Sequence, residues 1–411
     1  MDKKKVLNII SIVMGVVALA ALLAVIIVFT KGENNSPKEE ETTTAVDNLL
    51  EARKYYENGE YTKAVETYKL VEEERMEEQD WFCLANAYFE ENDFTNALNY
   101  SYEYLDIAKD AAMKEKIYTL VADCYVEAGN YRAAYNLLDK SGIDNLLESY
   151  CDSKTDLSIT LAPYEAEEEG FIYLGSYPQT GYEEKEIPDY VEAFEFSQDG
   201  YALVYGVEYI RVKDGKEYTY YAYEPVKWKI LKDTEDGMHL LSDMILDCKQ
   251  YSEIFKAVTW DTSDLRTWLN DDFYNSCFTD SDKEYIELHT TQPAVNYYHG
   301  FTAGVAVDNY IGLLSSEELG DGRYGFDKHT DVVGDPKRKA IGSDYAIAMG
   351  LFEDEENYGA WWTTTSAGVE NTSTVIVTEA GLLMMESGGM IVNKRDVGVR
   401  PFIIIKSDYN K

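Results

Sequence analysis

The chain has 411 residues, of which 45% are hydrophobic and 27% are charged, so it can bury the cores of two or three domains. Its formal net charge at pH 7 is −39, and no stretch rich in lysine and arginine offsets this charge. Nucleic acids, anionic lipid headgroups and polyanionic wall polymers would be repelled by such a chain, so the composition excludes them as partners.

The N-terminal segment has the pattern of a membrane anchor. Residues 6–29 are uncharged and mostly apolar, which as a helix gives a length of about 36 Å. Lysines 3–5 precede this run and glutamates 39–41 follow it, so the positive-inside bias places the N-terminus in the cytoplasm. A cleaved signal peptide is the alternative, but the run is long and no small-x-small site follows it. We expect residues 1–30 to form a cytoplasmic stub and transmembrane helix of a single-pass cell-membrane protein whose bulk is extracytoplasmic.

After a polar linker at residues 31–44, residues 45–155 contain an internal repeat. The segments that begin at Gly59, Asn92 and Gly129 align, with spacings of 33 and 37 residues. Each has an aromatic residue two positions on and an alanine five positions on, and a helical pattern precedes each. Glycine and asparagine suit the turn between paired helices, and alanine lets the two helices approach closely. The pattern predicts three helical hairpins.

These repeats resemble tetratricopeptide repeats, which form an all-α solenoid and bind a peptide or protein on their concave face. The resemblance implies a protein partner here, with Tyr55, Tyr88 and Tyr125 as contact residues. These tyrosines are also core positions of the repeat, and an array that serves only as a spacer or self-association surface is the alternative.

Residues 165–411 show short strand patterns with helices between some of them, which is typical of an α+β domain. Residues 258–274 predict an amphipathic helix that begins at an N-cap, Ser263. Four apolar residues recur at helical spacing and are predicted to face a core: Leu265, Trp268, Leu269 and Phe273. Arg266 and Asn270 fall on the opposite, solvent-facing side.

An ordered set of motifs runs through this domain: LGSYPQ at 174–179, VKWKIL at 226–231, LLS at 240–242, LLS at 313–315, WW at 361–362 and GVRP at 398–401. The set resembles an uncharacterised bacterial domain family of unknown function over residues 171–406. The insert at 183–217 is longer than that family implies. The layout is also similar to the C-type-lectin and formylglycine-generating-enzyme fold, in which the first and last strands pair. Residues 402–405 are the expected closing strand.

The familiar sequence motifs for catalysis and metal binding do not occur in this chain. Histidines 239, 289, 299 and 329 lack the HExxH spacing, no GxSxG sequence occurs, and the five cysteines form no local pair. Residues 268–271 read WLND, as in a calcium motif of lectins, but they fall within the predicted helix. We therefore predict no catalytic residue, no metal ligand and no cofactor, and calcium is left open without a supporting residue.

Aromatic residues remain as candidate ligand contacts. Tyr297, Tyr298, Trp361 and Trp362 lie in segments rich in Gly, Thr and Asn. Neighbouring side chains on a strand point to opposite faces, so we expect one tryptophan of the pair to be exposed for stacking on a sugar or peptide. We expect a membrane-anchored binding protein whose repeats recruit a protein and whose last domain recognises a glycan or peptide of the envelope. An enzyme acting on glycans or sulfatase-like substrates and a pure scaffold are the alternatives.

Overall fold

The computed structural model describes residues 38–153, 164–165, 168–183, 187, 191, 194–294, 296, 298, 304–328 and 333–407. The chain divides into two compact units. Unit 1 comprises residues 1–159, 182–208 and 215–220, and unit 2 comprises residues 160–181, 209–214 and 221–411. Part of the 183–217 insert belongs to unit 1.

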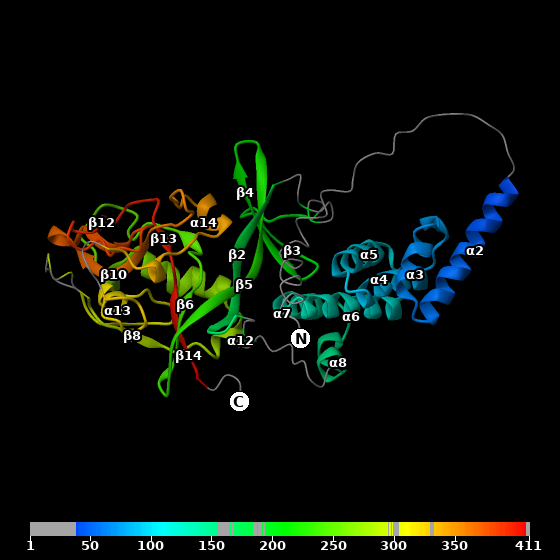
Figure 1. The fold of residues 1–411 in the computed structure, drawn as a ribbon, viewed down its shortest axis with the longest axis horizontal. Helices are drawn as coiled ribbons and strands as arrows, with labels where there is room; N and C mark the ends of the chain where they lie inside the picture. Colours follow the sequence, from blue (N-terminus) through cyan, green and yellow to red (C-terminus); the bar gives the residue numbers. More distant parts are fainter. Residues whose placement is uncertain are drawn as a thin grey trace. The chain divides into compact units, whose positions relative to one another are not determined.

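Unit 1 contains a series of helices in which each contacts the next (Figure 1). Their bounds are α2 Lys38–Glu57, α3 Tyr61–Tyr68, η2 Glu73–Arg75, α4 Glu78–Glu90, α5 Phe94–Ile107, α6 Ala111–Glu127, α7 Tyr131–Asp139 and α8 Leu146–Ser153. Gly59, Asn92 and Gly129 have positive φ angles of 73°, 60° and 73° at the turns after α2, α4 and α6. Ala64, Ala97 and Ala134 are fully buried. The predicted turn and contact positions are therefore confirmed.

The expected all-α solenoid is wrong, because unit 1 also holds β structure. The insert forms β3 Tyr201–Val204 and the start of β4 Val207–Asp214, joined by a turn at Tyr205 and Gly206. Tyr205 and Val207 pack against the cluster of buried residues from α4 to α8. The repeat pattern did not reveal this addition because the first of these strands begins at Tyr201, far beyond the end of α8 at Ser153.

The predicted membrane helix at 6–29 lies outside the described residues. Among the helices that the structure describes, none is long and apolar enough to cross a membrane. The expected single-pass membrane protein with a signal-anchor is therefore not supported.

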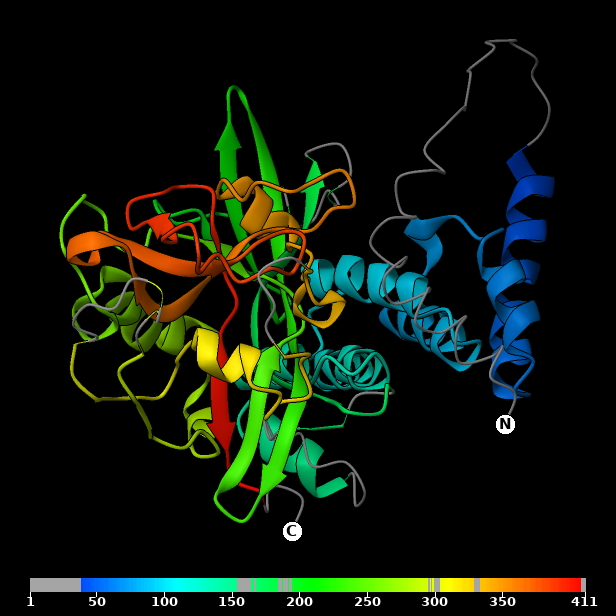
Figure 2. The ribbon, with the colours of Figure 1, turned by 60° about the vertical axis from the view of Figure 1, so that its left-hand side comes forward.

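The first sheet of unit 2 has neighbouring strands in the order β1-β2-β5-β6-β14, and the pairs β1–β2, β5–β6 and β6–β14 are antiparallel. The strands are β1 Tyr164–Glu165, β2 Phe171–Glu183, β5 Glu217–Thr234, β6 Gly237–Ser242 and β14 Phe402–Ile405. The predicted closing strand is β14, but it pairs with β6, from Phe402 opposite Leu241 to Ile405 opposite Met238. Figure 2 shows this red strand beside the green ones. The expectation that the first and last strands pair is wrong.

A second sheet has the order β12-β11-β10-β13-β7. Its strands are β7 Asp247–Cys248, β10 Trp361–Ala367, β11 Ser373–Val377, β12 Met390–Ile391 and β13 Gly398–Val399. A small third sheet pairs β8 His289–Thr291 with β9 Val307–Asn309, and short helices are α12 Asp280–Lys283, α13 Ser316–Gly320, η5 Pro336–Arg338, α14 Asp344–Ala348 and η6 Val369–Asn371. Strand β10 is buried along its whole length because a hydrophobic cluster lies on each of its faces.

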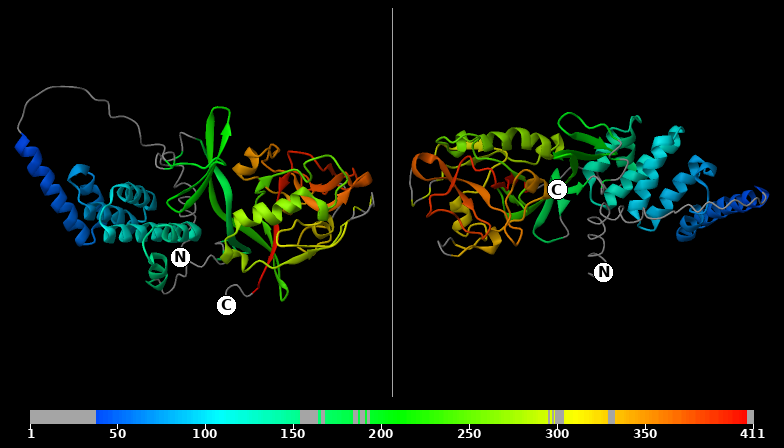
Figure 3. Two further views of the ribbon diagram at one scale, coloured as in Figure 1. Left: turned by 180° about the vertical axis from the view of Figure 1, so that it is seen from behind. Right: turned by 90° about the horizontal axis from the view of Figure 1, so that it is seen from above.

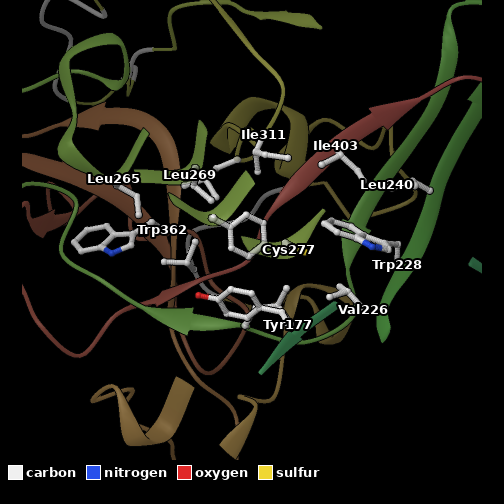
Figure 4. Packing of buried hydrophobic residues seen from close by; sticks show 14 of the residues in the cluster. Tyr177, Val226, Trp228, Leu240, Leu265, Leu269, Cys277, Ile311, Trp362 and Ile403 are labelled. Carbon is white, nitrogen blue, oxygen red and sulfur yellow. The ribbon is translucent and has the colours of Figure 1, made fainter. Parts of the chain in front are cut away.

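The predicted amphipathic helix is present in pieces: η3 Trp260–Thr262, α10 Asp264–Trp268, the π-helical turn η4 Leu269–Phe273 and α11 Tyr274–Cys277 (Figure 3). The Ser263 hydroxyl accepts a hydrogen bond from the Arg266 amide, which confirms the N-cap. Leu265, Leu269 and Phe273 are buried, and Figure 4 shows Leu265 and Leu269 in the cluster that also holds Trp362. This helical stretch therefore covers the core of unit 2.

Arg266 and Asn270 are half-buried and bind neighbouring segments, which corrects the prediction that they simply face solvent. The Arg266 guanidinium donates to the Asn309 side chain and the Asp308 carbonyl. The Asn270 side chain donates to the Ile311 carbonyl and accepts from the Tyr310 and Ile311 amides. Arg266 thus holds β9, and Asn270 holds the two residues that follow it, against the helix.

Candidate functional site

The two tryptophans of β10 are both buried. Trp361 and Trp362 have exposures of 0%, and they lie in different hydrophobic clusters on the two faces of the strand. Their indole N–H groups donate to backbone carbonyls, that of Trp361 to Arg338 and that of Trp362 to Lys249. The alternation of faces was right, but the inference that one ring is exposed was wrong, because both faces of the sheet are covered.

The GVRP motif has a structural role beside Trp361. The Arg400 guanidinium lies 5.2 Å from the Trp361 ring and donates to the carbonyls of Ser242, Asp243 and Arg338. Burial lowers the pKa of Arg400 to about 10. Arg338 is likewise buried and donates to the carbonyls of Leu319, Asp327 and Gly381. Buried arginines bound to main-chain carbonyls hold loops together, and the motif needs no ligand to explain it.

The LGSYPQ motif also ties strands together. The Gln179 side chain donates to the carbonyls of Glu224 and Pro225 in β5, and the Trp228 indole donates to the Leu174 carbonyl. The Tyr177 hydroxyl donates to a carboxylate oxygen of Asp247 at 2.7 Å. Burial raises the pKa of Asp247 and raises that of Tyr177 well above its ordinary value. The buried Asp247 carboxylate accepts hydrogen bonds from the Tyr177 hydroxyl and from the Cys248 amide, so it has its partners within the fold.

A cleft of about 300 Å³ opens on the surface of unit 2 next to the β10–β11 hairpin. Its lining comprises Phe352, Ala360, Ile376, Thr378, Glu379, Met384, Met390, Lys394, Asp396 and Val397. Ile376 is opposite Trp362 in the β10–β11 ladder, and both side chains belong to the same hydrophobic cluster. We take this cleft as the candidate site, and we call it the Phe352 cleft.

The lining combines apolar walls with three charged side chains. Phe352 is 58% exposed although it is a large apolar residue, whereas Ala360, Ile376 and Val397 are buried. The Lys394 ammonium forms an ion pair with Asp396 at 2.8 Å. With Glu379, the lining carries one more acidic than basic side chain. Sequence patterns missed this site because its residues are spread from 352 to 397, and the exposure of Phe352 cannot be read from the sequence.

The other predicted contact residues are not brought to this cleft. Tyr298 is 40% exposed and its amide donates to the Asn296 side chain, while Tyr297 lies outside the described residues. In the part of the chain that the structure describes, no cluster of three or more His, Cys, Asp and Glu residues could hold a metal ion.

The three predicted tyrosines of the helices have different environments. Tyr55 is half-buried and donates to Glu51, whereas Tyr88 is buried and stacks on Tyr100 with ring centroids 5.3 Å apart. Tyr125 is buried, and its hydroxyl donates to the Tyr205 carbonyl of the insert at 2.7 Å. They therefore do not form one exposed surface for a partner.

Comparison with known proteins supports one part of the sequence interpretation. Residues 235–407 match the family described as "Domain of unknown function (DUF6273)". The match contains the Phe352 cleft but starts after β2 and β5, so the expected coverage from residue 171 is too long. No tetratricopeptide, lectin or formylglycine-generating family matches. No curated protein and no solved structure matches the chain.

Proposed function

We propose that unit 2 is a recognition domain that binds an apolar side chain of a peptide or protein partner in the Phe352 cleft. The observation that carries this proposal is the 58% exposure of Phe352 at a cleft whose lining is mainly apolar. Exposing a phenylalanine ring to water is unfavourable, and such rings are the usual anchors of binding surfaces.

The chemistry of the lining favours a partner with a basic group beside its apolar side chain. Met384 and Met390 are flexible and polarizable, so they can adapt to apolar side chains of different shape. Lys394 is already paired with Asp396, which leaves Glu379 to attract a cation at the rim. A partner segment in which lysine or arginine flanks a large apolar residue fits this surface.

A peptide is favoured over a glycan because sugars stack on exposed aromatic faces. Both tryptophans that the sequence offered for stacking are buried, with their N–H groups bound to the backbone. Phe352 supplies one exposed ring, but most of the lining, including Ala360, Ile376 and Val397, has no side-chain group that can hydrogen-bond a sugar hydroxyl.

The test uses the full chain and fluorescent peptides in which Lys-X-Lys is flanked by glycines, with X as Leu, Met, Phe or Ser. We expect the apolar peptides to bind and the Ser peptide to bind at least tenfold more weakly. Phe352→Ser should weaken binding of the apolar peptides at least tenfold, because the anchor ring is lost. Phe255→Ser is the matched control, since Phe255 is 60% exposed and does not line the cleft.

The rival functions give other results in the same assay. Binding that is equal for all four peptides, or equal loss with Phe352→Ser and Phe255→Ser, contradicts the proposal. Binding or turnover of glycans that is insensitive to Phe352→Ser would favour the enzyme alternative. Capture of a protein by the full chain that Phe352→Ser leaves unchanged would favour a scaffold acting through unit 1.

A further inference from the structure

The turn between β3 and β4 has an unusual conformation for its sequence. Its two central residues, Tyr205 and Gly206, both have positive φ angles, 46° and 90°. This is the geometry of the tight hairpin turns in which Asn, Asp and Gly predominate. Tyrosine is disfavoured there, so contacts outside the hairpin must hold Tyr205 in place.

The helices of unit 1 supply those contacts. The Tyr205 ring stacks on the Tyr102 ring, with centroids 4.3 Å apart and planes 7° apart. The Tyr125 hydroxyl, which is hydrogen-bonded to that of Tyr102, donates to the Tyr205 carbonyl at 2.7 Å. The Asn136 side chain donates to the Gly206 carbonyl at 3.3 Å. Both turn residues are thus bound through their main-chain carbonyls, and Tyr205 also through its ring.

The contact also requires glycine at the second turn position. A Cβ atom on Gly206 would lie 2.3 Å from the Ala133 carbonyl oxygen and 2.9 Å from the Leu137 Cβ. Both atoms belong to α7, whose backbone cannot move aside without breaking its own hydrogen bonds. Next to the turn, the Arg132 guanidinium forms an ion pair with Glu208 at 2.6 Å.

We propose that Tyr102, Tyr125, Ala133 and Asn136 form a binding site for a tight Tyr-Gly β-turn, which the chain's own turn fills as an intramolecular ligand. The site recognises an aromatic ring at the first turn position, glycine at the second, and the main-chain carbonyls of both. A partner that presents a Tyr-Gly hairpin competes with the tethered turn for the same helices. This site is independent of the Phe352 cleft, and its test does not rely on the proposed function.

The experiment opens the site in the full chain and offers the turn in solution. The probe is a fluorescent hairpin peptide of residues 201–209, closed by a disulfide between added terminal cysteines. Gly206→Val drives the tethered turn out by the clash with Ala133, and Tyr205→Ala removes the stacked ring without adding a clash. We expect both variants to bind the probe at least tenfold more tightly than the original chain, because the tethered turn no longer competes.

Matched controls decide the interpretation. Gly215 also has a positive φ angle, 63°, but an added Cβ there meets no atom within 4 Å, so Gly215→Val should bind the probe no better than the original chain. Adding Tyr125→Phe to Tyr205→Ala should weaken probe binding at least fivefold, and a probe with Ala in place of Gly206 should not bind. Far-UV circular dichroism confirms the helices of each variant.

Absence of binding to Tyr205→Ala with intact helices would overturn the proposal. Equal binding to Gly215→Val and Gly206→Val would overturn it as well, since the probe would then be using another surface.

Discussion

Aromatic side chains serve different purposes in the helices of unit 1 and in the β10–β11 hairpin of unit 2. In unit 1, Tyr102 and Tyr125 use their hydroxyl groups and ring faces to hold a turn from elsewhere in the chain. In unit 2, Trp361 and Trp362 are enclosed by apolar clusters, and the indole N–H of each donates a hydrogen bond to a backbone carbonyl. A tyrosine hydroxyl that binds a turn can exchange one polar partner for another, whereas a tryptophan inside a covered sheet cannot. Recognition is therefore expected from the tyrosines and from exposed Phe352, and stability from the tryptophans.

The largest expected effect comes from truncating the tryptophans. Trp361→Ala and Trp362→Ala should each lower the free energy of unfolding by about 3–5 kcal/mol, since both rings are fully buried. Trp268→Ala is the control, because Trp268 is only partly buried at the edge of the same core, and it should cost less than half as much. Urea unfolding followed by far-UV circular dichroism measures these costs. A small loss for either β10 variant would mean that its ring is not a core residue.

A smaller effect concerns the pH dependence of unit 2, where two groups oppose each other. Burial lowers the pKa of His289 to about 4, so its contribution to stability is complete above its ordinary pKa of 6.5 and is lost as the pH falls towards 4. Burial, reinforced by Asp344, raises the pKa of Glu224 to about 7, so its contribution is complete below its ordinary pKa of 4.5 and is lost as the pH rises towards 7. Between pH 4.5 and 6.5 the two slopes largely cancel.

Single variants separate the two groups. Glu224→Gln should make the protein lose up to about 2–3 kcal/mol as the pH is lowered from 6.5 to 4.5, because the His289 slope then stands alone. His289→Phe should reverse the slope over the same interval. Urea midpoints at half-unit pH steps measure both. Identical slopes in the two variants would contradict the assignment of opposing groups.

The smallest effect distinguishes two tyrosines that occupy equivalent repeat positions. Tyr125→Phe should cost about 1 kcal/mol, because it leaves the Tyr205 carbonyl without its donor inside a buried contact. Tyr55→Phe should change stability by less than about 0.5 kcal/mol, since the Tyr55 hydroxyl only meets an exposed glutamate. Thermal unfolding of the full chain can compare them, and equal shifts would remove the distinction between the two positions.

Local features of unit 1 and unit 2 followed from the sequence. The turns at Gly59, Asn92 and Gly129, the cap at Ser263 and the buried positions Leu265 and Leu269 all lie where residue preference and periodicity place them. The candidate site could not be found in this way. Phe352 is an ordinary apolar residue in a loop, and Met384 and Lys394 reach the same cleft only because a long hairpin returns the chain to it.

Periodicity and capping depend on contacts within about one or two turns of the chain, so the sequence by itself determined where helices begin, turn and face a core. The partner of each surface was decided by the tertiary structure. Strand β14 pairs with β6 and not with the first strand. The sequence does not determine this choice, because the backbone N–H and C=O groups of a strand can pair with any strand of suitable geometry. Both faces of β10 are covered because two separate cores meet there, and Tyr125 meets Tyr205 because the insert returns to the helices across 80 residues.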